Sequence, residues 1–169
     1  AEKNRKSTMI YVSKIDVEHA DFYKVFEELK TQFGPQVCPI VVPVARGNET
    51  IYVNLMDFKA YQYKNGVAEE VVMPATGHRL DGLVTAINEA VAETSEELME
   101  KYFSGEPLTK AEIVQGIKSG VKDGTITPVV CGVATKLEAI DMVLDVINDL
   151  APTPQDTEGT KIDIGCSPV

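Results

Sequence analysis

Two short apolar segments, far apart in the chain, each end in a small polar cluster. Residues 9–12 precede Ser-Lys-Ile-Asp at 13–16, and residues 128–131 precede Gly-Val-Ala-Thr-Lys at 132–136. Polar groups that follow buried strands are a common way in which α/β proteins build ligand sites. If the two strands are parallel neighbours, the connection between them is far longer than the dozen or so residues that a parallel crossover needs. The sequence therefore predicts an inserted subdomain over roughly residues 41–126.

Apolar spacing and turn residues predict the elements that follow the first cluster. Four apolar residues recur at helical spacing over 22–33, and Gly34-Pro35 supplies a stop and a breaker. Turn signals at 46–48 and 64–66 then separate short apolar strands, a pattern typical of an antiparallel meander. The expected strands are 40–44, 50–58, 60–63 and 70–73.

The second half of the predicted insert is helical. Ser/Thr-x-x-Glu capping boxes at Thr94 and Thr109 mark two helix starts, and Gly124 is expected to stop the second helix. A last amphipathic helix is expected after the second cluster and before Pro152. Its predicted apolar face consists of Leu137, Ile140, Leu144 and Ile147.

These elements describe an α/β chain in which a partial parallel sheet carries an inserted α+β subdomain. Residues 1–40 are expected to hold the first strand, its cluster and a helix, and residues 41–126 the insert. Residues 127–152 are expected to hold the second strand, its cluster and the last helix. Residues 153–169, rich in Pro, Thr, Asp and Gly, are predicted to form a linker toward a further domain.

The composition is that of an acidic globular protein. With 44% hydrophobic and 25% charged residues the chain can bury a core, and its formal charge of −10 favours a basic protein partner over nucleic acid. No apolar run reaches the roughly 20 residues of a membrane-spanning helix, and no signal peptide is evident, so a cytoplasmic protein is expected. The three cysteines lack the paired spacing of a zinc site, and no metal site is predicted.

The first cluster resembles the Asn-Lys-x-Asp guanine motif of GTPases, with Ser13 in place of Asn. A carboxylate at Asp16 can accept from both N1–H and the C2 amine of guanine, groups that adenine lacks. The Lys14 stem would lie along one purine face and Lys136 along the other, while a backbone N–H near Ala134 could donate to O6. The alternative is two strand ends followed by polar residues that bind nothing.

Longer segments resemble the second half of the GTPase domain of the elongation factor G family, including its inserted subdomain. The matching stretches occur in the family's order, within residues 13–154. They read SKIDVEHADFYKVFEELKTQFG, EELMEKYFSGEPLTKAEIVQGIKSG, ITPVVCGVATK and MVLDVINDLAPTP. The resemblance implies a partial P-loop GTPase-type parallel sheet with an inserted α+β subdomain.

The resemblance also implies site residues. The family's guanine-binding Lys and Asp fall on Lys14 and Asp16, and its Ala and Lys fall on Ala134 and Lys136. Ser13 replaces the family's Asn, and the loss of one net hydrogen bond would weaken binding by about 0.5–1.5 kcal/mol. Val133 replaces a Ser, and Ala139 replaces a Gly. The predicted site for GTP or GDP therefore comprises Ser13, Lys14, Asp16, Val133, Ala134 and Lys136.

Hydrolysis of GTP needs parts that the sequence does not contain. Residues 77–82 have the glycine spacing of a phosphate-binding loop but lack the Lys-Ser/Thr pair. An Asp-x-x-Gly pattern at 156–159 falls in the predicted linker. The resemblance implies that the missing parts lie upstream of residue 1 in a larger GTPase. This chain alone is not expected to hydrolyse GTP.

Two functions from different classes follow. The first is the base-recognition part of a ribosomal translocation GTPase. The second is a non-enzymatic module, because the resemblance implies that the insert docks the C-terminal domain of the ribosomal stalk protein. The acidic helix region with Glu93, Glu96, Glu97 and Glu100 is either a solvated face or such a docking surface. Four aromatic residues between 52 and 63 have only Lys59 interleaved among them, so packing is favoured over nucleic-acid stacking.

Overall fold

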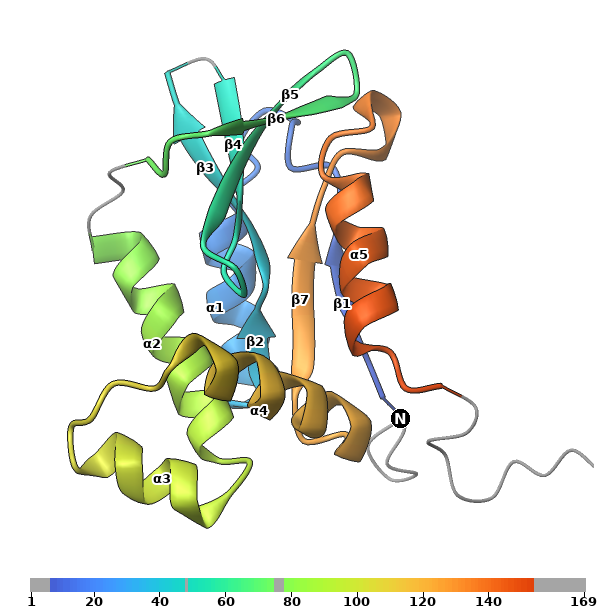
Figure 1. Cartoon of the computed structure of the whole chain (residues 1–169). Coiled ribbons are helices and arrows are strands. Elements are labelled where there is room, and N and C mark those ends of the chain that lie inside the picture. The colour runs from blue at the N-terminus through green and yellow to red at the C-terminus, as the bar shows by residue number, and fades with distance from the viewer. Residues whose placement is uncertain (1–6, 48, 75–77, 154–169) are drawn as a thin grey trace, which may run out of the picture.

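A three-stranded parallel sheet joins segments that are far apart in the chain. The structure, a computed structural model, describes residues 7–47, 49–74 and 78–153 (Figure 1). The sheet has the order β1-β7-β2, formed by β1 (Ile10–Val12), β7 (Thr127–Cys131) and β2 (Val37–Pro39). Tyr11 lies opposite Val130 in the parallel register of β1 and β7. The predicted pairing of the two cluster-bearing strands is confirmed.

The strand β2 was not predicted. Val37 and Cys38 are fully buried, and Ile40 continues the contact by donating its N–H to the carbonyl of Val129 at 2.8 Å. A strand of three residues is too short for a period-2 pattern to show in the sequence. Because β2 runs directly into the next sheet, the insert starts from the parallel sheet itself.

The antiparallel meander is confirmed. Its strands are neighbours in chain order: β3 (Val41–Arg46), β4 (Glu49–Asn54), β5 (Lys59–Lys64) and β6 (Val67–Val71). The predicted strand over 50–58 is too long, because Asn54 accepts from the N–H of Met56 and Phe58 has a φ of 57°. The chain therefore turns between β4 and β5 at residues that sequence spacing had assigned to a strand.

Local capping signals predict most helix ends. The helices are α1 (Phe22–Phe33), α2 (His78–Ala92), α3 (Glu96–Phe103), α4 (Lys110–Asp123) and α5 (Ile140–Leu150). The capping box of Thr109 with Glu112 is present, and Gly34 and Gly124 follow the ends of α1 and α4. The predicted cap at Thr94 is wrong by one residue, because its hydroxyl donates to a carbonyl of α2. Ser95 caps α3 instead.

The predicted apolar face of the last helix is wrong. Leu137 precedes α5, and Leu144 and Ile147 are 60% and 40% exposed. The buried residues of α5 are Met142, Val146 and Leu150. This helix has apolar residues on more than one side, so the side that packs on the sheet decides which of them are buried.

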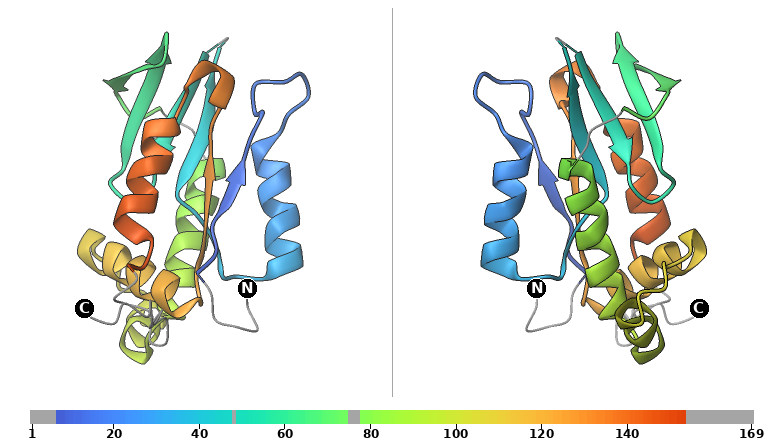
Figure 2. Two further views of the ribbon diagram at one scale, coloured as in Figure 1. Left: turned by 90° about the vertical axis from the view of Figure 1, so that its right-hand side faces the viewer. Right: turned by 90° about the vertical axis from the view of Figure 1, so that its left-hand side faces the viewer.

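One continuous core joins the parallel sheet to the insert. The helices α1 and α5 lie on opposite sides of the parallel sheet (Figure 2). The same core cluster contains Phe26 from α1, Ile51 from the meander and Ile87 from α2. Within the ranges that the structure describes, no helix is both long and apolar enough to cross a bilayer.

Candidate functional site

The two polar clusters meet at the carboxyl ends of β1 and β7. Asp16 follows β1, Lys136 follows β7, and the Lys136 ammonium lies 2.9 Å from the Asp16 carboxylate. Ser13 and Lys14 are exposed at the end of β1, and Lys14 has a φ of 57°. The structure therefore brings residues about 120 positions apart into direct contact.

The ion pair shifts the pKa of both partners. The hydrogen bond from Lys136 holds the pKa of Asp16 below its ordinary value, and the same bond raises the pKa of Lys136. Both groups are thus charged at neutral pH. Their side chains are 25% and 54% exposed, so the carboxylate remains accessible to a ligand from solvent.

The second cluster forms a tight loop. Ala134–Lys136 make one turn of 3-10 helix, and the backbones of Val133 and Glu138 exchange hydrogen bonds of 3.0 and 3.1 Å that close it. Val133 is buried, whereas Ala134 and Lys136 are exposed. A Cβ on Gly132 would lie 2.8 Å from the Glu138 carbonyl oxygen, so the close approach needs glycine at this position.

The residues that lie behind this loop were not predicted from the sequence. The Tyr52 hydroxyl donates to the Glu138 carboxylate at 2.7 Å, and the Tyr63 hydroxyl donates to Asp141. Burial raises the pKa of Tyr52, and its hydrogen bond to Glu138 raises it further. The sequence signal that could have indicated this contact is Tyr52 within an apolar strand, because a buried tyrosine hydroxyl needs a polar partner.

The remaining titratable candidates form no site in the described ranges. His19 is exposed beside Glu18. Cys38 and Cys131 are buried free thiols, and burial raises the pKa of Cys38 to about 12. No group of three or more metal-ligating side chains occurs among the described residues. Gly77, Cys166 and the pattern at 156–159 lie outside them.

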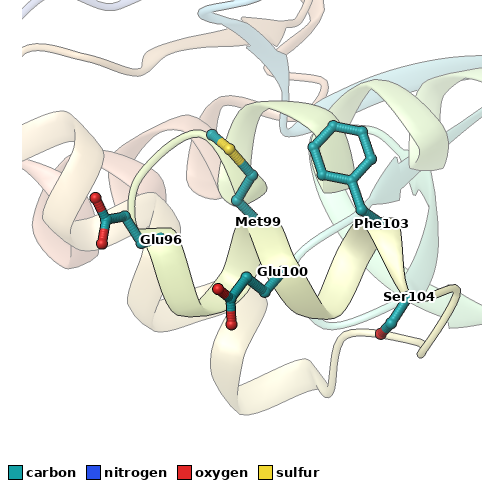
Figure 3. Close-up of a pocket in the computed structure, with 5 residues that line it drawn as sticks. All are labelled: Glu96, Met99, Glu100, Phe103 and Ser104. Carbon is teal, nitrogen blue, oxygen red and sulfur yellow. The ribbon is translucent and has the colours of Figure 1, made fainter.

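A second surface lies on α3. Glu96, Met99, Glu100, Phe103 and Ser104 line a shallow open groove (Figure 3). Met99 and Phe103 project from the same side of the helix and are 37% and 80% exposed. A bond of 2.7 Å from Lys101 to Glu112 ties α3 to α4. The groove therefore combines exposed apolar area with negative charge on an anchored helix.

A parallel sheet with polar loops at its carboxyl ends, interrupted by an α+β insert, defines the class: an α/β protein with a partial GTPase-type fold. A crystal structure of a protein from Thermus thermophilus matches with a TM-score of 0.79 and 28% identity, over 92% of this chain and 24% of that one. An elongation factor G-like protein of Thermotoga maritima is 32% identical over 173 residues, 97% of this chain. The chain fits one part of a protein of the elongation factor G family.

The matched proteins are much longer than this chain, which covers 25% of the Thermotoga maritima relative. No protein-family model matches the sequence. The resemblance to the elongation factor G family is confirmed, and so is the partial GTPase-type fold with an insert.

Proposed function

We propose that this chain is the guanine-recognising part of a translational GTPase that acts on the ribosome. The contact between Asp16 and Lys136 carries the proposal, because it joins the two clusters to which the resemblance assigns the family's base-binding residues. In the whole protein, GTP bound through this site would be hydrolysed in step with ribosome movement. Such work places the protein in the cytoplasm.

Each residue of the proposed site has a distinct task. The Asp16 carboxylate accepts hydrogen bonds from N1–H and the C2 amine of guanine. Its ion pair with Lys136 loosens when these bonds form. The methylene stem of Lys14 packs on the purine face while its ammonium stays in water. A backbone N–H at Ala134 donates to O6. Ser13 is shorter than the family's Asn and reaches less far, which weakens binding by about 0.5–1.5 kcal/mol.

Titration of nucleosides into the isotopically labelled chain, followed by NMR, tests the proposal. Guanosine is expected to shift the amide signals of Asp16 and Lys136 in a saturable manner. Inosine, which lacks the C2 amine, should bind more weakly, and adenosine should leave these signals unchanged. A site built on such hydrogen bonds rejects analogues that cannot form them. Equal responses to guanosine and adenosine would contradict base recognition.

Substitution of Asp16 sharpens the test. Asp16→Asn should lose affinity for guanosine and gain affinity for xanthosine, because the new amide can donate to the C2 carbonyl of xanthine. Glu18→Gln is the matched control, since Glu18 is an exposed carboxylate in the same loop. An Asp16→Asn chain that binds guanosine as well as the unmodified chain does would show that Asp16 is not the base acceptor.

A second candidate function is docking of the C-terminal domain of the ribosomal stalk protein. The groove on α3 favours it, because Met99 and Phe103 offer apolar area beside Glu96 and Glu100. Such a surface suits a segment that carries basic and apolar side chains together. Among the described residues, Glu96 and Glu100 form no ion pair that a partner would have to break.

Calorimetric titration with the stalk domain at two salt concentrations tests this docking. Phe103→Ala should weaken binding about tenfold, as expected for an exposed aromatic anchor. The double change Glu96→Lys with Glu100→Lys should weaken binding and remove most of its salt dependence. Glu27→Lys with Glu28→Lys on α1 is the charge-matched control. Equal effects of the two double changes would show that docking depends on net charge and not on the groove.

A further inference from the structure

The base-recognition loop is held from one side by the inserted sheet. The loop itself contains two non-glycine residues in the left-handed region, Leu137 with a φ of 56° and Ala139 with a φ of 60°. Such residues cost of order 1–3 kcal/mol each and persist only where the surroundings support them. The Asn65-Gly66 turn of the meander provides part of that support, because a Cβ on Gly66 would lie 3.2 Å from Leu137 Cβ.

Two tyrosines of the meander provide the rest. Tyr52 from β4 is 1% exposed, and its ring packs edge to face against Tyr63 from β5 with centroids 5.5 Å apart. Their hydroxyls donate to two carboxylates spaced three residues apart, Glu138 at the end of the loop and Asp141 in the first turn of α5. The pair thus fixes both sides of Ala139.

A continuous series of contacts connects the insert to the proposed base site. The Tyr52 hydroxyl bonds to the Glu138 side chain, and the Glu138 backbone bonds to that of Val133 in both directions. Val133 in turn accepts from the N–H of Lys136, the residue that pairs with Asp16. Each contact in this series, from Tyr52 to Asp16, is a hydrogen bond or an ion pair.

We propose that Tyr52 and Tyr63 are positioning residues that hold the 133–139 loop in its base-binding conformation. The positioning role is inferred from the geometry of the loop. Its effect on base affinity rests on the proposed guanine site. A tyrosine hydroxyl that served only to satisfy its own burial would not require an acceptor from this loop. Displacement of the inserted sheet would therefore change affinity for the base without any contact between the sheet and the base.

Removal of the two hydroxyls tests the proposal. Tyr52→Phe should weaken guanosine binding about three- to tenfold, the effect of one lost net hydrogen bond, and the double change with Tyr63→Phe should weaken it more. Tyr61→Phe is the matched control, because Tyr61 lies on the same meander. Unfolding temperatures are measured in parallel. If the unmodified chain binds guanosine, equal guanosine affinities for Tyr52→Phe and Tyr61→Phe would overturn the proposal.

Hydrogen exchange separates this proposal from the proposed function. In the nucleoside-free chain, the amides of Lys136 and Glu138 donate to Val133, and Tyr52→Phe should make their exchange faster without faster exchange in α4. Glu138→Gln keeps an acceptor oxygen and should perturb the loop less than Glu138→Leu does. Unchanged exchange in Tyr52→Phe overturns the positioning role. If Tyr52→Phe exchanges faster but the chain binds no guanosine, the positioning role is supported and only the proposed guanine site is contradicted.

Discussion

Replacing Phe26 by alanine is expected to lower the free energy of unfolding by about 3–5 kcal/mol, the usual range for a fully buried phenylalanine. Phe26 is 1% exposed on α1, and its ring stacks on Phe22 at a centroid distance of 6.3 Å. The change removes apolar contacts and leaves a cavity between α1 and the parallel sheet, which the surrounding residues fill only in part. Urea unfolding followed by circular dichroism measures the loss.

The matched control for this prediction is Phe33→Ala on the same helix. Phe33 is 50% exposed at the end of α1, so its removal should change the free energy of unfolding by no more than about 0.5 kcal/mol. Similar losses for the two variants would mean that α1 does not pack on the sheet through Phe26.

Replacing Gly120 by alanine is expected to destabilise the chain by about 1–3 kcal/mol. The new Cβ would lie 2.5 Å from Ile126 Cγ1 and 3.0 Å from Ile126 Cβ, and Ile126 is 1% exposed. Alanine favours a helix over glycine by about 1 kcal/mol, but the clash pushes Ile126 and with it the start of β7. Overpacking therefore outweighs propensity at this position.

The opposite sign is expected for Gly82→Ala in α2. A Cβ there meets nothing within 4 Å, so the substitution should stabilise the chain by about 0.4–1 kcal/mol. The two variants are compared by thermal and urea unfolding under one set of conditions. A stabilised Gly120→Ala chain would show that the connection from α4 to β7 is looser than its close contacts indicate.

Short-range signals in the sequence predicted much of the fold. The stop at Gly34, the capping box at Thr109 and the turn around Asn65 each depend on residues within a few positions of one another. The structure confirms all three. The parallel pairing of β1 with β7 was also predictable, because both strands end in polar clusters that a shared sheet edge would bring together.

Features that depend on distant packing were not predictable in this way. The burial of Met142 and the exposure of Leu144 on α5 depend on which side of the helix faces the sheet. In the candidate site, the positions of Asp16 and Lys136 were predicted, but their mutual ion pair was not. The bond from Tyr52 to Glu138 joins residues that are far apart in the chain, so no local sequence pattern indicates it.

The long separation of β1 from β7 also has a consequence for synthesis on the ribosome. About 120 residues lie between Asp16 and Lys136, so at about 5–20 residues per second a nascent chain carries the first cluster for roughly 6–24 s before the second exists. During that time β1 lacks the pairing with β7 that it has in the folded chain. The meander, whose strands pair with their immediate neighbours, can fold within this interval and thereby shorten the time that apolar surface spends uncovered.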